Sequence, residues 1–258
     1  MKLRPSVRFR QNLSLLAGAF LLSGAAFAQT DAELVLRNDE VQRVKVFGVS
    51  SSGLQLDIAT PDGKGRFSRP LAQIKEVRMA APAELNQALT QYQEKKYDAA
   101  IAALRALLTK YRGMPASWVQ QASATLGSVY LAKGDLAGAE AAFRDFQKLY
   151  PGQGSLQSDV GMALVAVAKK DFASARPKLE AVAEKALKEK NVNAGTALAY
   201  SATFLGLGQI QEAEGNPSEA LEHYLRTVTL FYHDRAAAAL AQERADALRV
   251  ANKNLAVP

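Results

Sequence analysis

The spacing of apolar residues changes once along the chain, near residue 80. Before that point, apolar and polar residues alternate in short runs such as Val41–Phe47 and Leu54–Ile58, and this alternation is typical of half-buried β-strands. From Pro82 onward, apolar residues recur every three or four positions, which places them on one face of a helix. The pattern predicts a small β unit followed by a long helical unit.

Residues 29–80 form the predicted β unit. Turn-forming clusters at Ser50–Gly53 and Thr60–Gly65 separate the alternating runs, and two further runs lie at Gly65–Pro70 and Ile74–Met79. We expect four or five short antiparallel strands, in a pattern that resembles a small SH3-like or Sm-like barrel. About fifty residues are marginal for an independent hydrophobic core, so we expect this unit to pack against the helices.

Residues 81–258 form the predicted helical unit, which we interpret as four helical hairpins and a last amphipathic helix over Asp234–Asn254 that caps the stack. Each hairpin has a small residue where its two helices must approach closely: Ala100, Ala139, Ala175 and Ala220. The interval between Ala175 and Ala220 is the longest of the three. Its extra residues, around Glu184–Gly195, form either extended helices or a loop.

The second hairpin carries a recognisable motif. Leu126, Gly127 and Tyr130 are followed by Ala139, Phe143 and Pro151, in the order and spacing L-G-x2-Y…A-x3-F…P. Gly134 and Asp135 suit the end of one helix and the N-cap of the next. The stretch resembles the tetratricopeptide repeat (TPR) family. The resemblance implies a mainly α fold, a TPR-like solenoid of αα-hairpins preceded by the small antiparallel β module. It also implies a protein that binds other proteins and seldom performs chemistry.

Two further segments of the sequence also resemble TPR proteins. Phe146–Pro151 and Tyr224–Tyr232 are similar to segments of exported bacterial TPR proteins of the cell envelope, such as the Tol-Pal-associated cell-division coordinator and the outer-membrane-assembly type. This chain departs from both types, because it has no lipid-accepting Cys and a β module stands where the coordinator has a coiled coil. The resemblance implies an envelope scaffold.

Residues 1–28 have the pattern of a secretory signal peptide. A basic start precedes the apolar stretch Leu13–Ala25, and Ala26–Ala28 forms an A-x-A cleavage site. We expect cleavage after Ala28 and a periplasmic or exported product that begins at Gln29. The alternative is an uncleaved membrane anchor, for which the apolar stretch is short. No later segment has the length and hydrophobicity of a membrane span, so we expect no stable membrane insertion after cleavage.

The charge balance follows partly from this signal. The chain has 32 basic and 25 acidic side chains and a net charge of +7. Four of the basic residues lie in the signal, so the remainder has 28 against 25, a net charge of +3. This small excess gives little reason to expect a nucleic-acid partner. The absence of Cys excludes disulfides and thiolate metal sites.

Little in the sequence suggests catalysis. Glu219 lies one helical turn before His223 and could share a ligand with it, but no third ligand is evident nearby, so we interpret His223 and His233 as surface or helix-end residues. The motifs of serine hydrolases, zinc proteases and phosphate-binding loops are absent. We expect a non-enzyme without a cofactor. An enzyme would need carboxylates in the groove of the solenoid, where only Glu212 is placed.

The TPR resemblance places the first helix of each hairpin along a concave groove. By register, the candidate groove residues are Leu85, Leu89, Tyr92, Gln121, Ser128, Leu131, Leu164, Gln209 and Glu212. This mostly apolar lining suits an amphipathic helix or an extended hydrophobic peptide of a cell-envelope protein. It lacks the Lys/Asn clamp with which chaperone-binding TPR domains hold a carboxylate. Two alternatives stay open: the C-terminal helix or the β module fills the groove, or the chain self-associates as a homo-oligomer.

Overall fold

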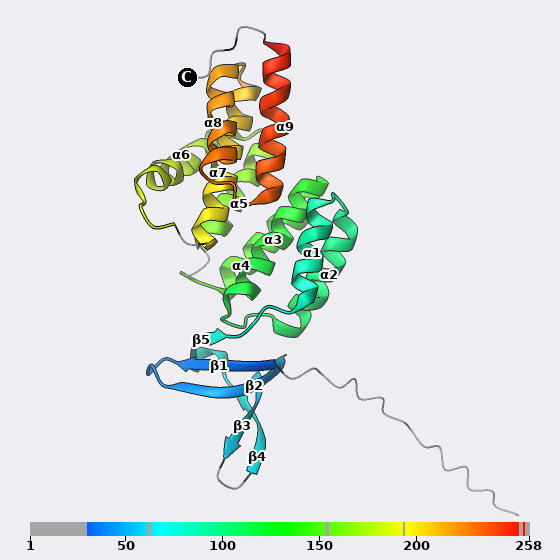
Figure 1. Cartoon of the computed structure of the whole chain (residues 1–258), viewed down its shortest axis with the longest axis vertical. Coiled ribbons are helices and arrows are strands. Elements are labelled where there is room, and N and C mark those ends of the chain that lie inside the picture. The colour runs from blue at the N-terminus through cyan, green and yellow to red at the C-terminus, as the bar shows by residue number, and fades with distance from the viewer. Residues whose placement is uncertain (1–29, 61–62, 153–154, 193, 253–254, 256–258) are drawn as a thin grey trace, which may run out of the picture.

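The computed structural model of the chain describes residues 30–60, 63–152, 155–192, 194–252 and 255. The helices form a stack, and the β unit lies at one end of it (Figure 1). The predicted signal peptide, residues 1–28, lies outside the described residues. Within the described ranges, each helix is too short or too polar to cross a bilayer.

The β unit is a single antiparallel sheet of five strands, which confirms the predicted β module. Its strands are β1 (Thr30–Leu36), β2 (Val41–Ser50), β3 (Gly53–Thr60), β4 (Gly63–Arg69) and β5 (Ile74–Arg78), in the spatial order β4-β3-β2-β1-β5. The alternation in the sequence has its expected cause, because Leu54 and Leu56 of β3 are fully buried on one face.

Nine helices follow in the described part of the chain. They are α1 (Ala83–Gln93), α2 (Tyr97–Tyr111), α3 (Ser117–Lys133), α4 (Leu136–Leu149), α5 (Ser155–Ala168), α6 (Phe172–Lys188), α7 (Ala194–Ala213), α8 (Pro217–Thr229) and α9 (Arg235–Ala251). They form four successive hairpins and a last helix, so the predicted solenoid is confirmed. The long interval before Ala220 is taken up mainly by long helices, since α6 runs to Lys188 through Pro177 and α7 begins at Ala194.

Local chemistry explains the hairpins. The four small residues at the helix crossings are fully buried, namely Ala100, Ala139, Ala175 and Ala220. Gly134 ends α3 with a φ of 85°, and the Asp135 carboxylate accepts a hydrogen bond of 2.8 Å from the Gly138 amide at the start of α4. Asn216 precedes α8 and is of a residue type that often caps helices, but its side chain donates to Gln211 and caps no amide.

The β unit and the first two hairpins share one hydrophobic core. Leu34 and Val77 of the sheet belong to the same buried cluster as Leu104 and Trp118 of the helices. The Val77 amide also donates a hydrogen bond of 2.8 Å to the Pro115 carbonyl, just before α3. A sheet of this size therefore obtains much of its buried apolar surface from the helices beside it.

Candidate protein-binding groove

Five helices of the solenoid enclose two adjoining cavities. The larger cavity has a volume of about 580 Å³ and is lined by α1, α3, α5, α7 and α9, with a contribution from Phe172. The smaller cavity has a volume of about 120 Å³. The two share a set of lining residues, namely Tyr92, Ser128, Leu164, Ala202, Asp234 and Ala236. We refer to the two cavities together as the groove.

The structure brings eight of the nine predicted groove residues together. Leu89 and Gln121 line the smaller cavity, and Leu131, Gln209 and Glu212 line the larger one. The other three, Tyr92, Ser128 and Leu164, line both. The helical register therefore predicted the wall of the groove, while its role in binding stays a prediction.

Leu85 is the exception. It lines neither cavity, and only 2% of its surface is exposed. It lies in the first turn of α1 and packs in the core that the first two hairpins share with the β unit. The TPR register assigned it to the groove, but it packs into this shared core instead.

The sequence reasoning missed the contribution of α9. Asp234, Ala236, Ala237, Leu240 and Arg244 all line the larger cavity. The groove residues predicted by register include none of these, although the N-terminal half of α9 lies over the concave side, as one of the open alternatives allowed. The alanine stripe Ala237–Ala241–Ala245, which is buried against its neighbours, was the available signal of a close helix contact.

The two ends of the solenoid meet across the groove. Helix α9 contacts α1 as well as α7 and α8. Lys95, just after α1, forms an ion pair of 3.5 Å with Glu243 of α9. The C-terminal helix therefore covers part of the groove, in line with one of the two alternatives, and the cavity of about 580 Å³ is the space that it leaves.

Burial perturbs the polar groups beneath α9. Asp234 caps this helix, because its carboxylate accepts hydrogen bonds of 3.1 Å from the Ala236 and Ala237 amides. Burial raises the pKa of this carboxyl above its usual value, and the two hydrogen bonds oppose the rise. Burial also raises the pKa of Tyr92, and the nearby Asp234 charge adds to the effect. Protonated Tyr92 and the Asp234 cap thus form a fixed polar spot in a mostly apolar wall.

A second polar spot lies at the other end of the larger cavity. The Glu212 carboxylate accepts a hydrogen bond of 2.6 Å from the Tyr224 hydroxyl and pairs with Arg244 at 3.2 Å. Burial raises the pKa of Tyr224, and the hydrogen bond to Glu212 acts in the same direction. Glu212 is therefore held by structural partners on α8 and α9. The sequence placed only Glu212 in the groove. Asp234, which caps α9, is a second carboxylate in its wall.

The two histidines lie in different surroundings. His223 is partly buried beside the Phe204 ring, with a centroid separation of 6.0 Å, and its pKa is lowered mainly by burial. His233 lines the smaller cavity, so it is not only a helix-end residue. In the ranges that the structure describes, no cluster of three or more His, Asp or Glu side chains is arranged to hold a metal ion.

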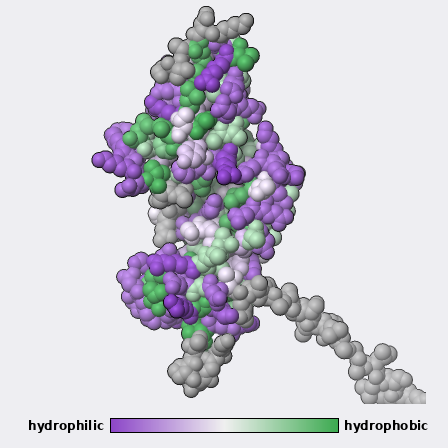
Figure 2. All heavy atoms as spheres, viewed as in Figure 1, coloured by the Kyte–Doolittle hydropathy of each residue, from purple (hydrophilic) through white to green (hydrophobic). Residues whose placement is uncertain are grey.

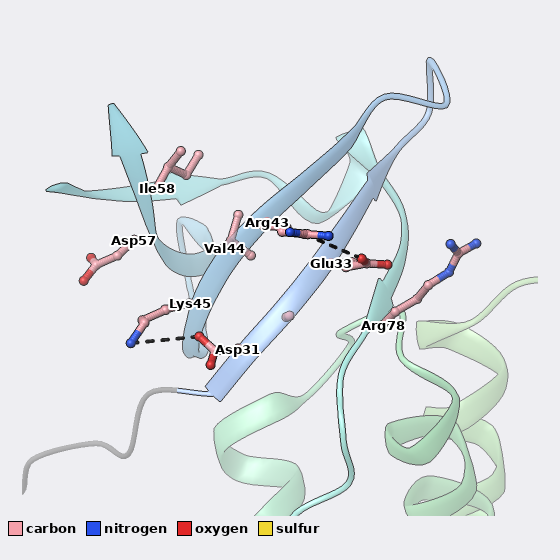
Figure 3. Close-up of a pocket in the computed structure, with 9 residues that line it drawn as sticks. Asp31, Glu33, Arg43, Val44, Lys45, Asp57, Ile58 and Arg78 are labelled. Atoms are coloured by element: carbon pink, nitrogen blue, oxygen red, sulfur yellow. Dashed lines mark ion pairs between the residues drawn. The ribbon is translucent and has the colours of Figure 1, made fainter. Parts of the chain in front are cut away.

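The β unit carries a separate, charged pocket of about 520 Å³ (Figure 3). Arg43 pairs with Glu33 at 4.0 Å and Lys45 pairs with Asp31 at 3.9 Å, each between β1 and β2. Charges of both signs lie side by side here, so the pocket presents no excess of one sign to a ligand. Figure 2 shows hydrophilic residues over much of the visible surface of the β unit and the helices, with hydrophobic residues between them.

Comparison with known proteins agrees with the hairpin architecture. Residues 83–113 and 125–152 match the sequence model of the tetratricopeptide repeat family. The matches span α1 with α2, and the C-terminal half of α3 with α4, and α5–α8 continue the same hairpin pattern. No curated protein and no solved structure matches the chain. Residues 83–113 and 125–152 are therefore tetratricopeptide repeats, and proteins with such repeats are generally non-catalytic and typically bind protein partners.

Proposed function

We propose that the chain is a non-catalytic scaffold that binds a segment of another protein in the groove. The observation that carries the proposal is the larger cavity, whose volume of about 580 Å³ lies within the range of about 300–1,000 Å³ typical of ligand sites. Its wall combines apolar side chains from four helices with two fixed polar spots. Such a wall gives affinity through burial and orientation through a few hydrogen bonds.

The lining favours an amphipathic partner. Leu131, Leu164, Val167, Leu205 and Leu240 supply apolar contacts, so a partner gains by burying aliphatic or aromatic side chains there. The cavity holds only a few side chains while α9 covers it. A longer helical segment requires α9 to move away from α1, and few contacts join these two helices. The Lys95–Glu243 pair between them is mostly exposed and therefore weak.

The proposed setting is the cell envelope. The pattern of residues 1–28 supports export, and a cleaved product would meet envelope proteins as partners. Cell fractionation with N-terminal sequencing of the isolated protein tests this point directly. We expect a periplasmic protein that begins at Gln29. A cytoplasmic protein that retains residues 1–28 would contradict the setting, while leaving the groove proposal to its own test.

The groove proposal is tested by site-specific crosslinking in cells. A photoreactive residue replaces Leu131 or Leu164, which lie in the wall of the larger cavity. In the control it replaces Leu187 of α6, an exposed residue that lines neither cavity. We expect the same envelope protein at both groove positions and not at Leu187. Crosslinks only to α9 would show a groove closed by the chain itself, and the proposal would then be wrong.

Self-association is a second candidate function, and one observation favours it. Val250 lies on the last helix, at the end of the stack, and 79% of its surface is exposed. Exposed repeat ends can stack between copies. Sedimentation over a range of concentrations tests the idea. An oligomer that Val250→Glu dissociates supports it, and a monomer at all micromolar concentrations excludes it.

A further inference from the structure

Strand β4 forms one edge of the sheet. The strand order places it last, with β3 as its neighbour in the sheet. In Figure 1 the β3–β4 hairpin extends away from the helices. The outer side of such a strand presents backbone amides and carbonyls that can pair with a further strand. The side chains along β4 decide which strand fits.

One face of the sheet carries a row of alternating charges that ends at this edge. The register pairs Asp31 with Lys45, Lys45 with Asp57, and Asp57 with Arg66, across β1, β2, β3 and β4. Figure 3 shows the first three side chains of the row on successive strands. Two of the neighbours form ion pairs, at 3.9 Å for Lys45–Asp31 and 3.7 Å for Arg66–Asp57. An acidic residue on an added strand would continue the alternation beside Arg66.

The Arg66 side chain is held at the edge and remains accessible. Its guanidinium lies over the Phe47 ring, 4.1 Å from the centroid, and 64% of the side chain is exposed. Stacking on an aromatic ring and pairing with Asp57 restrict its rotamers, so less entropy is lost when a carboxylate binds.

The opposite face carries an apolar row that ends at the same edge. The register aligns Val46, Leu56 and Phe67 across β2, β3 and β4. Val46 and Leu56 are fully buried, whereas 45% of Phe67 is exposed. An added strand with an apolar residue opposite Phe67 would cover this ring. Since Arg66 and Phe67 are consecutive, the fitting strand alternates acidic and apolar residues.

The charge of β4 argues against a second copy of this chain as the occupant. The strand contains Lys64, Arg66 and Arg69 and no acidic residue. Two β4 strands side by side would bring like charges together, which destabilises strand pairing. We infer that the β4 edge binds an extended, acidic segment of a different protein, which adds to the sheet with an acidic residue beside Arg66 and an apolar residue beside Phe67.

The test uses the full chain and a labelled ten-residue peptide of alternating Glu and Val. Fluorescence polarisation measures its affinity, and hydrogen exchange of the complex locates it. We expect saturable binding that weakens with added salt, together with slower exchange of the β4 amides. A matched peptide with Lys in place of Glu should bind at least tenfold more weakly. The absence of binding, or protection of the groove helices alone, would overturn the inference.

Two variants and a control separate the edge from general electrostatics. Arg66→Glu and Phe67→Ser should each weaken binding at least tenfold. Arg43→Glu reverses a charge whose side chain is 91% exposed on β2, away from the edge, and should change the affinity less than threefold. Circular dichroism confirms folding of each variant. Equal losses for Arg66→Glu and Arg43→Glu would show that only the net charge matters, and would contradict strand addition.

Discussion

The ring of Phe143 lies directly on the backbone of Gly161. A methyl group at Gly161 would collide with the ring carbons, and one at Gly127 would lie 2.6 Å from them. Phe143 belongs to α4, Gly127 to α3 and Gly161 to α5. One aromatic ring therefore joins the second hairpin to the helices that follow, at the point where the groove changes from the matched repeats to the unmatched ones.

Gly161→Ala should destabilise the fold. Overpacking at a filled core site costs about 1–3 kcal/mol, and the better helix propensity of Ala returns up to about 1 kcal/mol. We expect a net loss of about 1–2 kcal/mol in the free energy of unfolding, measured by urea denaturation. In a double-mutant cycle, Phe143→Leu should reduce the cost of Gly161→Ala because the smaller side chain leaves room. A stabilised Gly161→Ala protein would contradict the packing described here.

Asp234 should make the stability depend on pH in an unusual direction. Its pKa in the folded protein is raised by burial, so the folded state binds this proton more tightly than the unfolded state does. We therefore compare the free energies of unfolding of the native protein and of Asp234→Asn. The advantage of the native protein should fall as the pH rises from about 4, with a slope of at most about 1.4 kcal/mol per pH unit. Above the raised pKa the difference becomes constant.

Asp171→Asn is the matched control, because Asp171 caps α6 in the same way as Asp234 caps α9. Its pKa is lowered, first by the Ser174 hydroxyl and then by the Ser174 amide. The charged form is favoured in the folded state, so this contribution is present above the unfolded pKa near 3.8 and is lost as the pH falls through the folded pKa. The two variants should differ from the native protein with opposite pH slopes. Parallel slopes would show that Asp234 is not desolvated.

Tyr92 of α1 lines the groove together with Asp234 and Ala236 at the start of α9, and we expect its ring to support that helix. Tyr92→Ala should cost about 2–3 kcal/mol, less than a fully buried aromatic residue because Tyr92 is partly exposed. The loss should be accompanied by faster hydrogen exchange at the start of α9. Tyr92→Phe retains the ring and should leave the exchange of α9 nearly unchanged. Unchanged exchange in the Tyr92→Ala protein would mean that α9 is held by α7 and α8 alone.

The sequence predicted best those features that local chemistry determines. The stripe of apolar residues and the small residues at Ala139 and Ala220 follow from helical geometry alone, so the hairpins and most of the groove wall were predictable. Asp135 was a correct cap for the same reason. Leu85 could not be placed, because it lies in a core formed by the β unit and the first two hairpins together.

Other features depend on contacts between distant segments. The meeting of Tyr92 and Asp234 requires that the curvature of the whole stack bring α9 back to α1, and no local pattern fixes that curvature. The charge row through Lys45 and Arg66 requires the strand register, which bulges and turn lengths determine. Asn216 has the right type for a cap, but its amide finds a partner in Gln211.

Gly48 lies where strand β2 approaches helix α2 closely. Its φ is +152°, and a Cβ at this position would lie 2.9 Å from the Lys110 carbonyl oxygen and 3.2 Å from the Lys110 Cγ. Gly48→Ala should therefore separate β2 from α2 and lower the free energy of unfolding by about 1–3 kcal/mol. The amides of β2 should exchange faster, as measured by hydrogen exchange and mass spectrometry. Lys110→Ala removes the Cγ contact but keeps the carbonyl, so it should fail to rescue Gly48→Ala. Full rescue would show that side-chain crowding, and not the backbone approach, requires glycine at this position.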